Sequence, residues 1–176
     1  MNFFNDQVVR LTGIINEENS NKLLEAIGKC YKTNPSSPIV LAISSGGGNA
    51  GIGWGLYDLL KSMDLNLTTI AFGHVSSMAI PIFCLGKKRL VTVHTLIYIH
   101  ETGNTFKEET VRASEMLASA NKLSTSTKWQ ADIVSKVSGG KITRNRWLDM
   151  MAKEKCLNAK EMIKFGIAHK ILKTTD

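Results

Sequence analysis

The sequence has few cysteines and no long apolar run, and both shortages limit what the protein can be. Its three cysteines, Cys30, Cys84 and Cys156, lie far apart in a chain of 176 residues and form no CxxC pair. This number and spacing argue against a disulfide framework and a zinc site, and are typical of a reducing compartment. No apolar stretch approaches the roughly 18 residues of a membrane-spanning helix, and the chain does not start with a signal-peptide pattern. We expect a soluble, cytoplasmic protein with no metal and no cofactor.

Aromatic residues are also scarce, at 7% of the chain, and there are only three prolines. The net charge of +7 would permit binding to acidic surfaces, but the lysines and arginines are spread along the sequence without interleaved stacking aromatics. Nucleic acid is therefore not an expected partner. Fourteen glycines indicate turns made with glycine, and the length fits one domain over residues 1–176.

Two stretches repeat the order of apolar strand, glycine-containing turn and helix. Residues 39–43 are a short apolar run followed by a glycine cluster at 44–49 and a helical pattern. Residues 67–72 are a second run, which ends at Gly73 ahead of a helical pattern over 78–85. Two successive βα units predict a parallel α/β sheet with both turns at one edge. The other predicted strands are 7–12, 87–93, 95–99 and 167–172, and the other short helices are 15–31, 143–154 and 158–165.

Ser77 lies in the second turn, where we expect the strand to end and the helix to begin. The first amides of a helix have no partner within it, so the N–H of Met78 is available to an oxyanion on a carbonyl attacked by Ser77. Pro81 fits this placement, because with Ser77 as N-cap it falls in the first turn. A serine that only caps a core helix is the alternative. The glycine cluster at 44–49 could bind a peptide backbone or an oxyanion through its N–H groups, and a simple turn is the alternative. It matches no phosphate-binding motif.

A serine nucleophile needs a base, and the sequence offers four histidines. His100 is the best placed, because it ends an apolar strand ahead of a loop, where catalytic residues of α/β proteins collect. His74 lies within the same turn as Ser77, while His94 and His169 belong to other parts of the predicted sheet. A purely structural role for His100 is the alternative.

Residues 106–137 contain no proline or glycine and predict one helix of about eight turns. The helix is rich in serine and threonine, and its apolar stripe is thin. Such a helix is too polar for a core element and suits an arm that packs on a second subunit. We therefore expect a homo-oligomer.

Several groups of residues, taken in order, resemble the Clp protease proteolytic subunit family, ClpP. They are Ser44-Ser-Gly-Gly-Gly48 with Tyr57-Asp58, Gly73-x-x-x-Ser77-Met-Ala79, Ile99-His100, and Leu157-Asn-Ala-x-Glu161-x-x-x-Phe-Gly166-Ile. The likeness runs from about residue 8 to residue 172. It implies the ClpP/crotonase-like α/β fold of repeated βαβ units, with residues 106–137 as the handle helix between rings. It also implies a serine endopeptidase that cleaves peptides or unfolded proteins inside heptameric rings, stacked as a tetradecamer.

Residue by residue, the resemblance assigns Ser77 as the nucleophile and His100 as the general base. It assigns the backbone N–H groups of Gly48 and Met78 to the oxyanion hole. This agrees with the chemistry expected of a serine, a histidine and two amides at one edge of a sheet.

The third member of the catalytic triad departs from the family pattern. Counting back from Leu157 without a gap places the family's aspartate on Met150, which cannot orient an imidazole. We predict that the neighbouring Asp149 takes this place, with Glu154 or no acid as the alternatives.

Three further departures concern partners and substrate. The first predicted strand begins within about seven residues of Met1, which argues against the axial loops by which the family docks an AAA+ unfoldase. Gly46 replaces the family's proline, and residues 101–105 replace a glycine-rich strand that aligns the substrate chain, so this aligning surface is expected to be shorter. Two other functions stay open. One is a crotonase-like acyl-CoA enzyme, and the other is a ClpP-like structural subunit without turnover.

Overall fold

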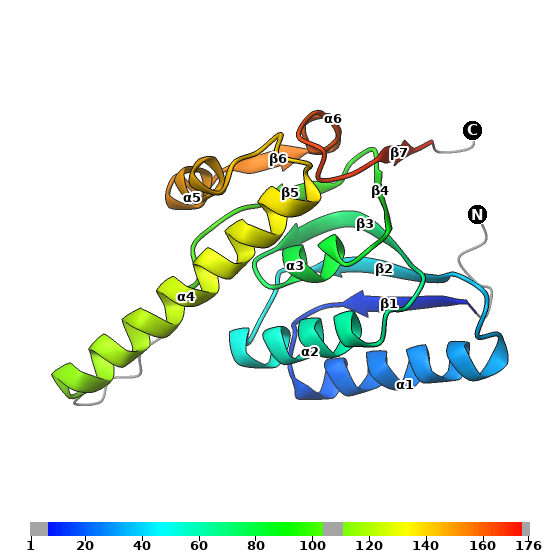
Figure 1. The fold of residues 1–176 in the computed structure, drawn as a ribbon, viewed down its shortest axis with the longest axis horizontal. Coiled ribbons are helices and arrows are strands. Elements are labelled where there is room, and N and C mark those ends of the chain that lie inside the picture. The colour runs from blue at the N-terminus through cyan, green and yellow to red at the C-terminus, as the bar shows by residue number, and fades with distance from the viewer. Residues whose placement is uncertain (1–6, 104–110, 174–176) are drawn as a thin grey trace.

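A computed structural model describes residues 7–103 and 111–173, which form a parallel β-sheet with helices packed against it (Figure 1). The strands are β1 (Val8–Thr12), β2 (Ile39–Ser45), β3 (Leu67–Ser76), β4 (Lys88–Thr92), β5 (Leu96–Tyr98), β6 (Cys156–Asn158) and β7 (Lys170–Leu172). The helices are α1 (Glu17–Thr33), α2 (Ala50–Ser62), α3 (Ala79–Cys84), α4 (Ala113–Val137), α5 (Arg144–Ala152) and α6 (Ala159–Lys164). No helix in these two described ranges has both the length and the apolar character needed to cross a membrane.

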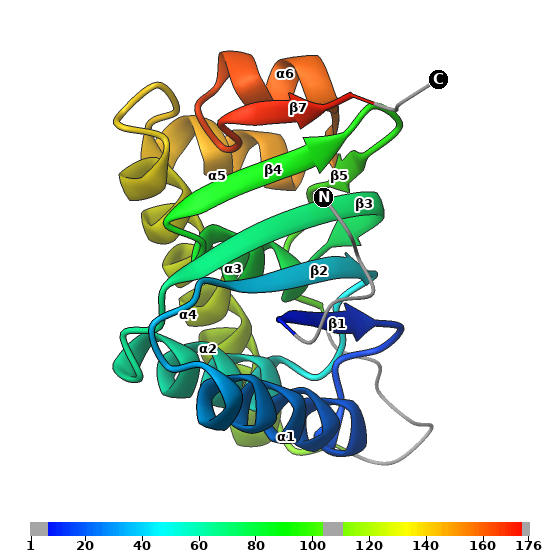
Figure 2. The same cartoon turned by 90° about the vertical axis from the view of Figure 1, so that its right-hand side faces the viewer.

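The main sheet has the order β1-β2-β3-β4-β7, and every neighbouring pair in it is parallel (Figure 2). β5 branches from this sheet, parallel to the end of β3, and pairs with β6 in the antiparallel direction. Helices α1 and α2 lie side by side along the sheet (Figure 1). The predicted α/β fold of repeated βα units is therefore confirmed.

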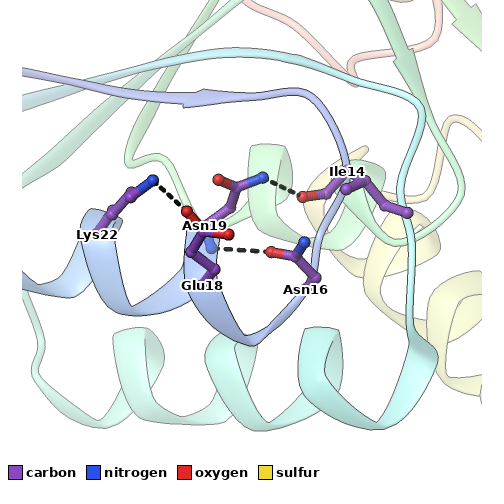
Figure 3. Close-up of polar contacts among 5 residues, drawn as sticks. All are labelled: Ile14, Asn16, Glu18, Asn19 and Lys22. Atoms are coloured by element: carbon purple, nitrogen blue, oxygen red, sulfur yellow. Dashed lines mark hydrogen bonds and ion pairs between the residues drawn. The ribbon is translucent and has the colours of Figure 1, made fainter.

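The N-terminus of α1 is capped by the loop that leads into it from β1 (Figure 3). The side chain of Asn16 accepts a hydrogen bond from the N–H of Asn19 at 2.8 Å, and the Asn19 side chain donates to the carbonyl of Ile14 at 2.9 Å. Within this capped loop, the N–H of Ile15 donates to the carbonyl of Gly47 at 2.8 Å. An N-cap of this type satisfies a helix amide that has no partner within the helix. The cap of α1 thereby also fixes the loop that supports the glycine cluster.

Strand β3 does not end at Gly73, contrary to the prediction from the sequence. It continues to Ser76, with Gly73 at a φ of +61° inside the strand. The continuation has a structural reason, since β3 pairs with β4 up to Ala71 and then with β5 from His74 onward. Pairing with β5 provides hydrogen-bond partners for backbone N–H and C=O groups that would otherwise bond to water.

The prediction that Ser77 is the N-cap of the next helix is also wrong. The N-cap of α3 is Met78, and Pro81 is the third helical residue, which still lies in the first turn and loses no intrahelical bond. Ser77 instead occupies the junction between strand and helix.

The C-terminal third holds one element that the sequence did not predict. β6 is a three-residue strand that pairs with β5, with Ile97 opposite Leu157. A strand this short has no periodicity to recognise. The Asn158–Glu161 capping box at the start of α6 is confirmed, with bonds of 3.1 and 2.9 Å. The predicted last strand is shorter than 167–172, because Ile167 and Ala168 bond back to Met162 at the end of α6.

Helix α4 begins at Ala113 in the described part of the chain, and the predicted start of the long helix at 106–110 lies outside the described residues. The helix packs against α3 and α5 through its C-terminal half. The half that begins at Ala113 projects away from the body (Figure 1). Met116 and Leu117 on that half are exposed.

A buried arginine joins the C-terminal segment to the sheet. Arg89 on β4 is 6% exposed and donates from its guanidinium to the carbonyls of Ile167 at 2.7 Å and Val137 at 2.9 Å. Its backbone N–H donates to Nδ1 of His169 at 3.0 Å, while its guanidinium lies 2.9 Å from the other ring nitrogen. Burial and the charge of Arg89 lower the pKa of His169. Only the neutral imidazole can accept at a nitrogen here, since the protonated ring has two donors.

Acid is therefore expected to destabilise this C-terminal attachment. Because the folded-state pKa of His169 is lowered, its contribution to the free energy of unfolding is fully present above the ordinary histidine pKa of about 6.5. It is lost as the pH falls from there through the lowered folded-state pKa. Denaturant unfolding at about pH 7.5 and about pH 5 would measure the loss. The pH dependence should be weaker in His169→Gln than in wild type and in the control His94→Gln, and equal slopes in all three proteins would contradict the assignment.

Candidate active site

The ends of three parallel strands place the predicted site residues at one edge of the sheet. Ser45 at the end of β2 is paired with Val75 of β3, and Ser76 at the end of β3 is paired with Tyr98 at the end of β5. The segments that follow these strands therefore leave the sheet together. They carry the glycine cluster, Ser77 and His100, as the sequence predicts.

Ser77 has a φ of +52°, a left-handed conformation that is uncommon for a residue with a Cβ atom. Its carbonyl accepts a hydrogen bond at 3.1 Å from the side-chain amide of Gln130, which is 3% exposed on α4. Backbone strain of this kind persists only where the surroundings enforce it. Gln130 is a supporting residue that sequence reasoning missed, because a glutamine inside a polar helix shows no sign of facing the core.

The glycine cluster packs directly against Ser77. A Cβ atom on Gly47 would lie 2.5 Å from Cβ of Ser77 and 3.0 Å from the backbone nitrogen of Met78, and its φ is +90°. A Cβ on Gly48 would lie 2.3 Å from the carbonyl oxygen of Ile15. Only glycine allows this close approach of three backbone segments.

The sequence resemblance assigns the N–H groups of Gly48 and Met78 to an oxyanion hole. Among residues 7–103 and 111–173, no hydrogen bond uses the N–H of Gly48 or of Met78. Gly48 is exposed to water, whereas Met78 is 2% exposed, and an anion that reached both N–H groups would satisfy them.

The imidazole of His100 is half-buried and points its Nδ1 at the carbonyl of Glu101, 2.7 Å away. Because a carbonyl only accepts, Nδ1 carries the proton in this contact. The ring also contacts Tyr98, with centroids 5.8 Å apart and planes at 38°. Within the described residues, the Ser77 hydroxyl and His100 share no hydrogen bond. Catalytic hydrogen bonds are often long or misaligned without substrate, so this geometry does not exclude the pair.

The three candidate positions for an acid differ in their surroundings. Asp149 is 57% exposed, and its carboxylate lies 2.6 Å from the ammonium group of Lys153. Met150 packs into the core. Glu154 accepts a hydrogen bond at 3.0 Å from the hydroxyl of Tyr98, and this bond raises the pKa of the Tyr98 phenol. The structure therefore gives Glu154 a contact to a neighbour of His100, whereas it pairs Asp149 elsewhere.

An apolar pocket of about 490 Å³ opens beside the glycine cluster, between the start of α2 and α4. Trp54 and Trp129 form one wall, with ring centroids 5.3 Å apart and planes at 82°. The indole N–H of Trp54 donates to the hydroxyl of Ser126 at 2.8 Å, and Thr102 donates to the same oxygen at 3.1 Å. Two lining residues are close in sequence to the predicted site, since Thr102 follows His100 by two residues and Ala50 directly follows the glycine cluster.

No group of three or more histidine, cysteine, aspartate or glutamate side chains in the described ranges is arranged to hold a metal ion. Cys30 and Cys84 are buried, and Cys156 is exposed.

Comparison with known proteins identifies the family of this chain. The family model for Clp protease matches residues 1–175. The proteolytic subunit 2 of the ATP-dependent Clp protease of Treponema denticola is 27% identical over 177 residues, covering 97% of this chain and 84% of the relative. Subunit 3 of Rhodococcus jostii is 28% identical over 100 residues, and subunit 1 of Chlamydia trachomatis is 29% identical over 89 residues.

In these last two matches the alignment covers 56% and 49% of this chain. The chain spans about half the length of both relatives, 50% and 46% respectively. The family model, in contrast, covers nearly the whole sequence in one match. The chain belongs to the Clp protease family.

Proposed function

We propose that the protein is a cytoplasmic serine endopeptidase that cleaves peptides or unfolded proteins within a self-compartmentalised homo-oligomer. One observation carries the proposal. Ser77 is held in a left-handed conformation, packs against Gly47 and precedes the amide of Met78, and neither this amide nor that of Gly48 has a hydrogen-bond partner in the described chain. A core serine requires neither the left-handed backbone nor the glycine contact, whereas a nucleophile that generates an oxyanion requires donors close to it.

The chemistry assigned to these residues is acyl transfer. The Ser77 hydroxyl attacks the scissile carbonyl carbon and gives its proton to Nε2 of His100. The amides of Gly48 and Met78 stabilise the oxyanion, and His100 then protonates the leaving amine as the peptide C–N bond breaks. A water molecule that His100 deprotonates hydrolyses the acyl-enzyme. Since Nδ1 of His100 carries a proton in its contact with Glu101, Nε2 is the nitrogen free to accept.

For the acid that orients His100, the contacts favour Glu154 over Asp149. Asp149 forms an i,i+4 ion pair with Lys153 on the exposed side of α5. Glu154 precedes β6, and the N–H of Ile99 donates to the carbonyl of Lys155 at 2.8 Å, which holds this segment against the end of β5. We therefore assign Glu154 this role.

The apolar pocket beside Trp54 and Trp129 supplies a place for a side chain of the substrate next to the cleaved bond. Apolar walls with a few fixed hydroxyl groups are typical of a subsite that selects by size and apolar character. This arrangement suits an unfolded chain, because apolar side chains are accessible only when the substrate is unfolded.

The projecting half of α4 supports assembly into stacked rings, and we propose heptameric rings that pair as a tetradecamer. Met116 and Leu117 are 54% and 64% exposed on this half. Exposed apolar side chains on an arm outside the body are typical of an interface with another copy. The three relatives are named as subunits of ATP-dependent proteases, so an AAA+ unfoldase is the partner to test on the assembled ring.

Labelling with a fluorophosphonate, read by intact mass on the native oligomer, tests the proposal. Wild type is expected to gain one adduct per chain, and His100→Ala to react about 10²-fold more slowly or worse, because the general base is absent. His94→Ala is the matched control, since His94 lies in an exposed turn, and it should react like wild type. A folded, assembled wild-type protein that forms no adduct would overturn the peptidase assignment and favour an acyl-CoA enzyme or a structural subunit.

A further inference from the structure

Tyr98 contacts both the proposed acid and the proposed base. Its hydroxyl donates a hydrogen bond to the carboxylate of Glu154 at 3.0 Å, and its ring contacts the imidazole of His100 with centroids 5.8 Å apart. Tyr98 is the last residue of β5, and His100 follows it by two residues. The three side chains form one contiguous group at the edge of the sheet.

In this group, Glu154 and His100 are each hydrogen-bonded to a third residue and not to each other. The Glu154 carboxylate is bonded to Tyr98, and the Nδ1–H of His100 is bonded to the carbonyl of Glu101 at 2.7 Å. Neither bond is one that a working acid–histidine pair would use, since that pair needs Nδ1–H to donate to the carboxylate. The φ of Glu154, +47°, is the left-handed value common in the residue that follows a helix C-cap, here that of α5. The bond to Tyr98 therefore holds the acid in a position that is not the productive one.

The Glu154 carboxylate can move from Tyr98 to His100 without a net loss of hydrogen bonds. The carboxylate leaves the Tyr98 hydroxyl and accepts from Nδ1–H of His100, while Tyr98 and the carbonyl of Glu101, both near solvent, bond to water. The new bond joins a carboxylate to an imidazole that becomes positively charged during the reaction, and charge-assisted bonds are the stronger kind. Substrate binding or oligomer contacts need to supply only a small bias for the exchange.

We propose that Tyr98 restrains the proposed active site by withholding the Glu154 carboxylate from His100, and that release of this contact activates Ser77. The proposal rests on the proposed serine peptidase function and deepens it with a regulatory contact. It makes Tyr98 a positioning residue that acts against catalysis, so its removal should increase activity. A residue that merely supports the fold would have the opposite effect.

The test compares the second-order rate constant of fluorophosphonate labelling for the assembled full chain and four variants. Tyr98→Phe keeps the ring and removes the hydroxyl, and we expect it to react about three- to tenfold faster than wild type. Glu154→Gln should react about tenfold more slowly or worse, and Tyr98→Phe with Glu154→Gln should react as slowly as Glu154→Gln alone. Tyr31→Phe, an exposed tyrosine on α1, is the matched control and should match wild type.

A second readout does not depend on activity. The hydrogen bond to Glu154 raises the pKa of Tyr98, so Glu154→Gln should shift the ionisation of that phenol to lower pH in ultraviolet difference titration, with Tyr98→Phe identifying the step. An unshifted step means that the contact is not formed in solution, which overturns the restraint. If the phenol ionisation shifts but Tyr98→Phe is labelled no faster than wild type, the restraint is also overturned. In that case the peptidase assignment stays intact, provided that wild type is labelled and Ser77→Ala is not. Absence of labelling in wild type and in every variant would overturn both.

Discussion

Ser77→Ala is expected to remove peptide hydrolysis almost completely. Loss of the nucleophile in enzymes of this chemistry costs on the order of 10⁶-fold in kcat, equivalent to about 8 kcal/mol of barrier. The oxyanion amides and the substrate pocket stay in place in this variant, so substrate should still bind. Steady-state cleavage of a short fluorogenic peptide, together with a peptide-binding measurement, would separate the two effects.

Ser76→Ala is the matched control for this variant. Ser76 is adjacent and buried, and its hydroxyl donates to the carbonyl of Tyr98 at 2.9 Å. Its loss should cost about 1 kcal/mol of stability while the enzyme keeps its nucleophile. If Ser77→Ala retained wild-type turnover, or if Ser76→Ala lost as much as Ser77→Ala, the nucleophile would have to be another group.

Gly47→Ala is expected to inactivate the site without touching a side chain that reacts. The added Cβ would lie 2.5 Å from Cβ of Ser77 and 3.0 Å from the nitrogen of Met78, and the φ of +90° disfavours any L side chain. Either Ser77 or the Met78 amide must move, and loss of one oxyanion donor costs about 10²–10³-fold in kcat. The rate constant of acylation in single-turnover experiments would measure the effect.

Gly46→Ala supplies the control one residue away. Gly46 is exposed, its φ is not positive, and the nearest atom to an added Cβ is on the His74 ring, 3.7 Å away, an ordinary contact distance. The alanine variant should keep its activity within a few fold. Equal losses in the two glycine variants would show that the whole turn is sensitive and would remove the argument for a specific close approach at Gly47. Circular dichroism and native mass measurements on both would exclude misfolding as the cause.

The sequence alone identified the elements that rest on local pattern. The βα repeats, the glycine cluster after β2 and the Asn158–Glu161 capping box follow from periodicity and from residues with restricted backbone preferences, which act over a few neighbouring positions. The same signals placed Ser77 and His100 at the ends of parallel strands. Parallel strands that pair as neighbours must end at one edge, so this part of the site could be predicted before any contact was known.

Only the tertiary structure decided which side chains support these two residues. The extension of β3 past Gly73 depends on β5, which becomes a new hydrogen-bonding neighbour there. Gln130 reaches Ser77 across 53 positions of sequence, and the Tyr98–Glu154 contact joins residues 56 apart, so neither leaves a periodic trace. Local preferences act through the backbone of adjacent residues, whereas these contacts arise from how α4 and the segment after α5 pack on the sheet. The sequence therefore determines which segments form strands and helices, whereas the end of β3 and the contacts around Ser77 and His100 exist only once the chain has packed.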